Sequence, residues 1–214
     1  MKHLRRALLI SLSCLGSLSQ PAWSDTSQSY EFKVFLGEQE IGRQRFDVSS
    51  AGEQTQVRVD AQFDVKFFYI TFYQYRHTNS EKWERTCLRE IRSQTDDNGD
   101  AYYVNGSFEN GQLQVQTQTG NWSADDCIKT FAYWDPEWIE GDRLLNSQTG
   151  ELLPVSILSM GEETISVQGV PTRTTRRRII TNEFTVDLWY TEKGKWVALQ
   201  STTKKGETLR YVLQ

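Results

Sequence analysis

The sequence predicts an all-β protein with a single large antiparallel sheet that is curled or forms an open, spiral β-barrel. Apolar and polar residues alternate with a period of two through most of the chain after Tyr30, as in strands with one buried face. Turn dipeptides such as Asn110-Gly111 separate the alternating segments, and no long stretch has helical periodicity. About a dozen strands with short connections indicate one sheet that curls or closes on itself.

Residues 1–24 have the pattern of a secretory signal peptide. A basic stretch precedes an apolar run, and Ala22 and Ser24 stand at the −3 and −1 positions of a small-residue cleavage site. The apolar run is shorter than the roughly 20 residues of a membrane span. The alternative of lipidation at Cys14 is disfavoured because the preceding residues match a lipidation box poorly. We expect a periplasmic or secreted protein whose exported part, residues 25–214, is a single β domain without a transmembrane span.

The composition limits the partners. The formal net charge is −4, and removal of the three basic residues of the signal peptide leaves −7. An acidic surface repels nucleic acid and anionic lipid head groups, so we expect no nucleic-acid partner. The aromatic content of 12% is too high for a disordered chain.

Two cysteines, Cys87 and Cys127, remain after the signal peptide. Export would place them in a compartment that favours disulfide bonds. A bond between them would close a loop of about 40 residues and stabilise the fold by roughly 4 kcal/mol in the chain-entropy account. The alternative is a pair of buried free thiols.

Strands are expected on both sides of one irregular segment. The first group lies at residues 30–36, 40–48, 57–65, 75–84, 88–95, 101–108 and 113–119, followed by a loop at 120–126. The second group lies at residues 152–158 and 164–170, joined around Gly161, and at 173–180, 184–191, 196–203 and 208–213. Within the acidic run 96–100, Asn98-Gly99 favours a hairpin turn over a calcium loop, because the bidentate Glu that ends such a loop is missing.

Residues 66–75 (KFFYITFYQY) break the alternation, since aromatic or aliphatic residues occur on both faces of the expected strand. One interpretation is a core strand that is covered on both sides. The other is a strand that crosses into a bend or forms an aromatic wall that lines a ligand cavity. The candidate ligand-binding residues in this segment are Phe67, Phe68, Phe72 and Tyr73.

The irregular segment at residues 127–155 is rich in Trp and Pro. Asp135 and Pro136 have the types expected at the N-cap and first position of a helix, so we predict a short helical turn at 135–141. Such an insertion would cover the open end or groove of a curled sheet. Trp134 and Trp138 are therefore added to the candidate ligand-binding residues.

Few catalytic groups are available. His77 is the only histidine after the signal peptide, which excludes a multi-histidine zinc site, and the sequence contains no G-x-S-x-G elbow, P-loop or G-x-G-x-x-G fingerprint. His77 is expected to be an ordinary sheet residue. We expect no catalytic residue, no metal site and no cofactor.

Paired carboxylates leave one catalytic alternative, the hydrolysis of envelope glycans. Nearby tryptophans would suit the stacking of sugars. The spacing singles out no pair among the candidates Glu81, Glu84, Asp135, Glu137, Glu140 and Asp142.

Residues 176–178 form the one basic run in this acidic chain. On a strand, Arg176 and Arg178 lie on one face and Arg177 on the other. One interpretation is a solvated edge strand whose charges prevent edge-to-edge pairing. The other is an anion or carboxylate contact at a cavity mouth, so Arg176 and Arg178 are also candidate ligand-binding residues.

The segments EKW (81–83), FAYWDPE (131–137), LLNSQTGELLPV (144–155) and VDLWYTEKGKWVALQ (186–200) carry a resemblance that covers essentially the whole exported chain. The sequence resembles a bacterial family of exported domains of unknown function. Its C-terminal strands are also similar to periplasmic families that form curled or spiral β-barrels related in shape to the lipoprotein-carrier fold. The resemblance implies a Gram-negative exported location and a curled sheet, favours binding over catalysis, and supplies no catalytic residue.

The expected function is therefore non-enzymatic. A curled sheet would enclose an apolar groove for a hydrophobic small molecule or lipid, or for an envelope protein. The first alternative is a structural or protein-interaction module of the cell envelope, and the second is the glycan hydrolase.

Overall fold

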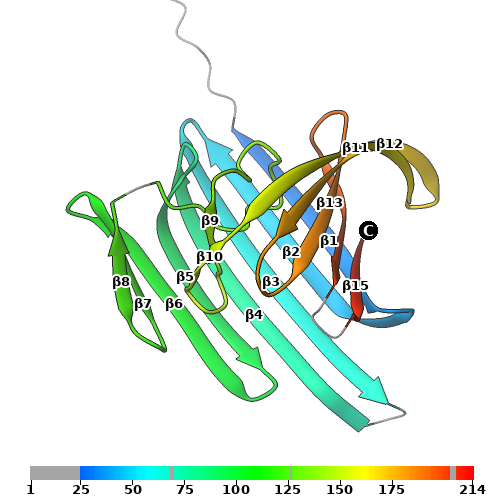
Figure 1. Ribbon diagram of the computed structural model, residues 1–214, viewed down its shortest axis with the longest axis horizontal. Helices are drawn as coiled ribbons and strands as arrows, with labels where there is room; N and C mark the ends of the chain where they lie inside the picture. The colour runs from blue at the N-terminus through cyan, green and yellow to red at the C-terminus, as the bar shows by residue number, and fades with distance from the viewer. Residues whose placement is uncertain (1–24, 68–69, 126, 203–205) are drawn as a thin grey trace, which may run out of the picture.

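The computed structural model describes residues 25–67, 70–125, 127–202 and 206–214, which contain strands and no helix (Figure 1). The expected signal peptide lies outside these residues. The strands are β1 (Thr26–Leu36), β2 (Gln39–Ala51), β3 (Gln54–Phe67), β4 (Ile70–Glu84), β5 (Cys87–Asp97), β6 (Asp100–Glu109), β7 (Gln112–Thr117), β8 (Asn121–Ala124), β9 (Arg143–Leu145), β10 (Leu152–Pro154), β11 (Ser156–Val167), β12 (Val170–Ile180), β13 (Thr185–Thr191), β14 (Trp196–Thr202) and β15 (Thr208–Leu213).

Thirteen of these strands form one antiparallel sheet in the order β11-β12-β13-β14-β15-β1-β2-β3-β4-β5-β6-β7-β8. Neighbours in the sheet are also neighbours in sequence, except where β15 pairs with β1 and joins the two ends of the described chain. The sheet curls but does not close, since β8 and β11 remain its edges (Figure 1). The expectation of one large, curled antiparallel sheet is confirmed.

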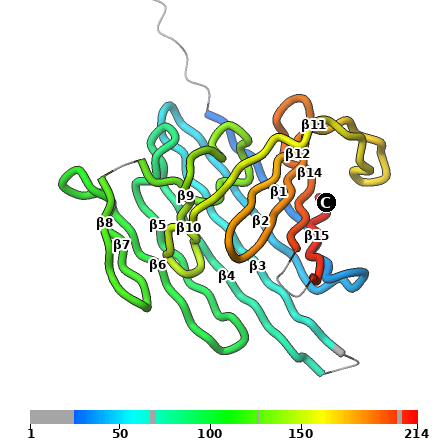
Figure 2. Tube along the Cα trace, viewed as in Figure 1, coloured from blue at the N-terminus to red at the C-terminus, as the bar shows by residue number. Residues whose placement is uncertain are grey.

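The residues that connect the two edges cross the concave face of the sheet. We call residues 127–155 the crossing segment; it contains the small β9–β10 ladder, which lies over the larger sheet (Figures 1 and 2). Aromatic residues pack it onto the sheet. The rings of Tyr133 and Trp196 have centroids 5.8 Å apart, and those of Trp134 and Trp83 are 5.9 Å apart at a T-shaped angle. The main core therefore lies between the sheet and this segment.

The predicted disulfide bond is present. Cys87 at the start of β5 is bonded to Cys127 at the start of the crossing segment, with Cα atoms 5.0 Å apart. A backbone hydrogen bond of 2.9 Å from the amide of Leu88 to the carbonyl of Ile128 lies beside it. One end of the crossing segment is thus attached to the sheet by a covalent bond.

At 135–141, where we predicted a short helical turn, the crossing segment has a turn at residues 136–138 and no helix. The Asp135 carboxylate accepts a hydrogen bond of 2.9 Å from the amide of Glu137, as an N-cap residue would. The amide of Trp138 then donates to the carbonyl of Asp135, and the chain leaves the turn at Ile139. The capping chemistry was recognised correctly, but the packing of Ile139 and both tryptophans against the sheet ends the turn before a helix forms.

Three other boundaries differ from the prediction. Residues 66–75 are not one strand, because β3 ends at Phe67 and β4 begins at Ile70, its antiparallel partner. Gly161 is a bulge inside the single strand β11, and the hairpin to β12 turns at Gln168-Gly169, both with positive φ. The expected loop at 120–126 contains β8. By contrast, Asn98-Gly99 forms the predicted hairpin turn with φ of 56° and 98°.

Candidate ligand-binding site

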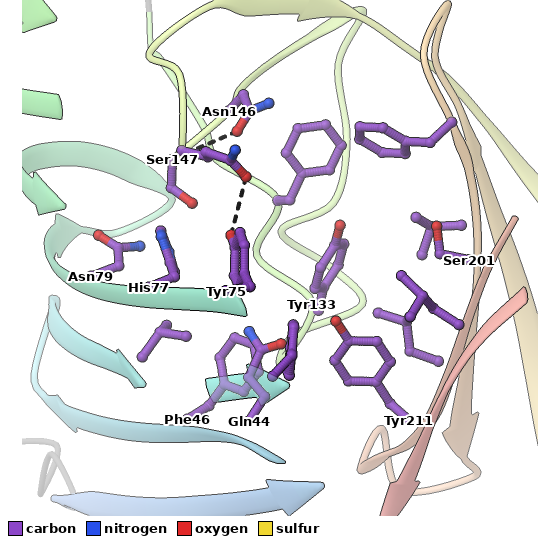
Figure 3. Close-up of a pocket in the computed structure, with 18 of the residues that line it drawn as sticks. Gln44, Phe46, Tyr75, His77, Asn79, Tyr133, Asn146, Ser147, Ser201 and Tyr211 are labelled. Carbon is purple, nitrogen blue, oxygen red and sulfur yellow. Dashed lines mark hydrogen bonds between the residues drawn. The ribbon is translucent and has the colours of Figure 1, made fainter. Parts of the chain in front are cut away.

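A cavity of about 640 Å³ lies between the concave face of the sheet and the crossing segment (Figure 3). Its wall is formed by β1 to β5 on one side, by β13 to β15 and Phe184 on the other, and by the crossing segment across the top. The lining residues are Leu36, Ile41, Gln44, Phe46, Val59, Phe63, Val65, Tyr73, Tyr75, His77, Asn79, Glu81, Asp97, Thr130, Phe131, Tyr133, Trp134, Asn146, Ser147, Gln148, Phe184, Val186, Leu199, Ser201, Glu207, Leu209 and Tyr211.

One side of the cavity is apolar. It is formed by Leu36, Ile41, Phe63, Val65 and Leu209, near the end of the sheet where β1 and β3 end and β2 and β4 begin. These residues belong to, or pack against, a small hydrophobic cluster that is separate from the main core. The cavity therefore offers an apolar contact surface at one end of the sheet.

A polar stripe runs along β4, the strand next to β3. Tyr73, Tyr75, His77, Asn79 and Glu81 are alternate residues, so they point to the same face of the sheet. Figure 3 shows Tyr75, His77 and Asn79 side by side on this strand. Polar side chains thus occupy five successive inward positions, where a sheet with a solid core would carry apolar residues.

Hydrogen bonds connect the end of the stripe near the start of β4 to the crossing segment. The Tyr75 hydroxyl donates to Gln148 Oε1 at 3.1 Å, and Gln148 Nε2 donates to Asp97 Oδ2 at 3.2 Å. The Tyr73 hydroxyl donates to the other oxygen of Asp97 at 2.6 Å. Burial, the main cause, raises the pKa of both tyrosines, so their hydroxyls stay protonated and act as donors.

The other end of the stripe, nearer the end of β4, contains the buried carboxyl group of Glu81. Glu81 accepts hydrogen bonds from Asn79 Nδ2 at 2.8 Å, Trp83 Nε1 at 2.9 Å and the Thr130 hydroxyl at 3.3 Å. Burial raises the pKa of Glu81, and the three hydrogen bonds oppose that rise. With both oxygens engaged, Glu81 is held as a structural group. Asn79 differs, because its Oδ1 is buried and has no hydrogen-bond partner.

His77 lies between these two groups and is 6% exposed. Its Nδ1 shares a hydrogen bond of 2.8 Å with the Thr95 hydroxyl of β5. Burial lowers the pKa of His77 to about 4, so the imidazole is uncharged at neutral pH. It is the only histidine after residue 24, and it lines the cavity rather than serving only as an ordinary sheet residue.

We expect His77 to make the protein sensitive to acid. Its pKa of about 4 in the folded state lies below the ordinary value of 6.5, so the unfolded chain binds a proton that the folded chain does not. Stability should fall as the pH decreases from 6.5 to 4, by about 3 kcal/mol from this residue. Urea unfolding of the wild type and of His77→Gln between pH 6.5 and pH 4 measures this loss of stability. The difference between the two curves should depend on pH as stated, and parallel curves would contradict the assignment.

The structure brings some of the predicted ligand-binding residues together. Tyr73 and Trp134 line the cavity. Trp138 packs against Trp83 instead, with ring centroids 5.3 Å apart, and Phe72 is 61% exposed near the β3–β4 hairpin end. Phe68 and the side chain of Phe67 lie outside the described residues.

Arg176 and Arg178 do not line the cavity. Arg176 Nη2 contacts Asp187 Oδ2 at 2.7 Å, and Arg178 Nε contacts Asp187 Oδ1 at 2.8 Å, so one carboxylate of β13 joins the two. Arg177 points to the other face, as predicted, and donates to the carbonyl of Pro136 in the crossing segment. The edge-strand interpretation is wrong, because β12 lies between β11 and β13.

Most of the polar lining was not recognised in the sequence. The signal was present on β4, where the period of two places the residues from Tyr73 to Glu81 on one face. Tyr133, Gln148 and Tyr211 join the lining through the path of the crossing segment and the pairing of β15 with β1. Neither of these long-range arrangements has a local sequence signal.

The described residues contain no group of three or more His, Cys, Asp or Glu side chains placed to hold a metal ion. No helix in the described part of the chain is long and apolar enough to cross a membrane. The six carboxylates considered for glycan hydrolysis are not gathered in the cavity, since only Glu81 is among its lining residues.

Fold and site together define an open, curled β-barrel with a partly polar internal cavity beneath a disulfide-attached crossing segment. Residues 32–214 match a family described as a domain of unknown function, DUF6134, and the chain belongs to that family. The fold is similar to the crystal structure of a β-barrel-like protein of the domain of unknown function DUF1849 from Brucella abortus. That match has a TM-score of 0.63 and 8% identity, and it covers 87% of this chain and 94% of the other. A search of curated proteins found no match. The predicted membership of an uncharacterised family with a curled barrel fold is confirmed.

Proposed function

We propose that this protein is an exported, non-enzymatic binding protein that holds a hydrophobic or lipidic ligand inside its curled sheet. The observation that carries the proposal is the cavity of about 640 Å³ on the concave face. Its size lies within the range of about 300 to 1,000 Å³ that is usual for small-molecule sites, and such sites combine apolar walls with a few polar groups. The disulfide bond is compatible with an oxidising compartment outside the cytoplasm.

Filling the cavity should abolish binding. Gln44 lines the cavity from β2, so Gln44→Trp would place a large side chain in the space that the ligand needs. We expect at least a tenfold loss of affinity for the fluorescent probe 1-N-phenylnaphthylamine, because the indole ring would occupy space that the probe needs. Fluorescence titration measures this loss.

Gln62→Trp is the matched control. Gln62 is exposed on the neighbouring strand β3 and does not line the cavity, so the same substitution there should leave probe binding unchanged. If Gln44→Trp binds the probe as well as the wild type does, or if both variants lose binding equally, the cavity is not the binding site.

A protein-interaction module is the second candidate. Ile70 and Phe72 are 65% and 61% exposed near the end of the β3–β4 hairpin, and exposed apolar groups of this size favour a contact surface. An envelope protein would be the partner. This function predicts that Ile70→Ser and Phe72→Ser reduce partner capture, whereas Gln44→Trp does not.

A further inference from the structure

The charge of the cavity wall restricts the ligand. Among the described lining residues there are three carboxylic acids, Glu81, Asp97 and Glu207, and no lysine or arginine. The one titratable base, His77, is held uncharged by burial. An anionic head group there would meet carboxyl groups and, among the described lining residues, no lysine or arginine, which is unfavourable. The wall therefore disfavours fatty acid anions and phosphorylated head groups.

One acceptor atom of the cavity wall has no hydrogen-bond partner, and it indicates which ligand head group the wall favours. Asn79 is 6% exposed, it uses its Nδ2 to donate to Glu81, and its Oδ1 has no partner. A buried acceptor without a partner is destabilising, and a ligand that donates a hydrogen bond to it would remove that cost. Asn79 lines the cavity, so this acceptor belongs to the same space as the candidate ligand.

The strand register places the polar and apolar contacts at different depths. Asn79 lies opposite Val59, whereas Tyr73 lies opposite Val65, close to the last pair of β3 and β4, Phe67 and Ile70. The apolar residues Leu36 and Leu209 pair with each other at that same end of the sheet. A ligand whose head group reached Asn79 would thus have its chain on the apolar side, directed toward the turns.

The volume of the cavity limits the size of the ligand, including its hydrocarbon chain. A volume of 640 Å³ corresponds to roughly 20 groups of the size of water, at ~30 Å³ each. A single-chain amphiphile has this size, whereas a lipid with two long acyl chains is larger.

On the basis of the proposed function, we infer that the cavity takes a single-chain amphiphile whose head group is uncharged and donates a hydrogen bond to Asn79 Oδ1. Amides and alcohols of long-chain hydrocarbons have this chemistry. Free fatty acids, which are anions at neutral pH, have the same chain but the wrong head group.

Three probes with the same hydrocarbon chain test the inference by displacement of 1-N-phenylnaphthylamine from the wild type at neutral pH. Tetradecanamide has an uncharged donor, methyl tetradecanoate has only acceptors, and tetradecanoate is an anion. We expect the amide to displace the dye at a concentration about tenfold lower than either of the others, as for one hydrogen bond to a buried acceptor. In Asn79→Leu, which lacks the acceptor, the amide should lose its advantage over the ester.

The outcomes separate this inference from the proposed function. If tetradecanoate displaces the dye as well as the amide does, the inference is wrong, while the proposed function stands because a lipidic ligand binds. If the dye binds to the wild type but the amide and the ester are equal, the donor requirement is wrong. If neither the dye nor any of the three probes binds, both proposals fail. The comparison in the wild type remains decisive even if Asn79→Leu does not fold.

Discussion

Removal of the Cys87–Cys127 bond is expected to lower the free energy of unfolding by about 4 kcal/mol. The two residues are separated by 40 positions, and opening a loop of that length gives the unfolded chain this much additional freedom in the chain-entropy account. The folded state should also lose the attachment of the crossing segment at its beginning. Urea unfolding of residues 25–214 with and without a reductant measures the effect.

The double variant Cys87→Ser, Cys127→Ser is the control for the reductant. Its unfolding curve should coincide with that of the reduced wild type and should not respond to reductant. If the oxidised and reduced wild type unfold at the same urea concentration, the bond does not stabilise the fold and its role as an attachment of the crossing segment is wrong.

Trp134→Ala should destabilise the protein by about 3 to 5 kcal/mol, the usual cost of removing a large buried aromatic side chain. Trp134 is 7% exposed and packs against the rings of Trp83 and Phe46, which connect the crossing segment to β4 and β2. Its backbone carbonyl also lies 3.5 Å from the Tyr30 hydroxyl. Loss of the indole ring removes its contacts with both of these strands. Chemical denaturation followed by far-ultraviolet circular dichroism gives the change.

Trp138→Ala is the comparison, since Trp138 is only half-buried and lies outside the cavity lining. It should cost less stability than Trp134→Ala and leave probe binding intact. A Trp134→Ala variant that is as stable as the wild type but no longer binds the probe would contradict this view. Trp134 would then be a ligand contact and not a structural residue of the core.

The parts of the fold that could be predicted are those with local signals. The alternation of residues 57–65 placed β3 correctly, and the positive φ that Asn98-Gly99 and Asn110-Gly111 tolerate identified two hairpin turns. The disulfide bond followed from the cysteine count and the expected export. Strand existence and one covalent link were therefore accessible from the sequence.

The parts that could not be predicted depend on contacts between distant residues. Residues 66–75 are rich in aromatic residues throughout, so their composition hides the end of β3 at Phe67 and the start of β4 at Ile70. Gly161 has the φ of a turn residue but occupies a bulge, because β11 continues to pair with β12 beyond it. The crossing segment covers the concave face because it links the two edges of the sheet, and sheet order has no local signature.

The candidate site contains residues that have a local sequence signal and residues whose position depends on contacts between distant parts of the chain. The aromatic residues Tyr73 and Trp134 were found because aromatic clusters suggest a cavity wall, and both line the cavity. Asn79 and Glu81 were not recognised as inward-facing, since polar residues on a strand normally face solvent. Their burial becomes evident only when the curled sheet and the crossing segment enclose them.

Native mass spectrometry of the protein, purified without denaturation from the cells that express it, tests the central claim, which is that the cavity holds a ligand. The wild type and the Gln62→Trp control should carry the additional mass of a single-chain amphiphile, which delipidation removes. Gln44→Trp should have only the mass of its polypeptide. A wild type without additional mass, or the same additional mass on Gln44→Trp, would contradict the account.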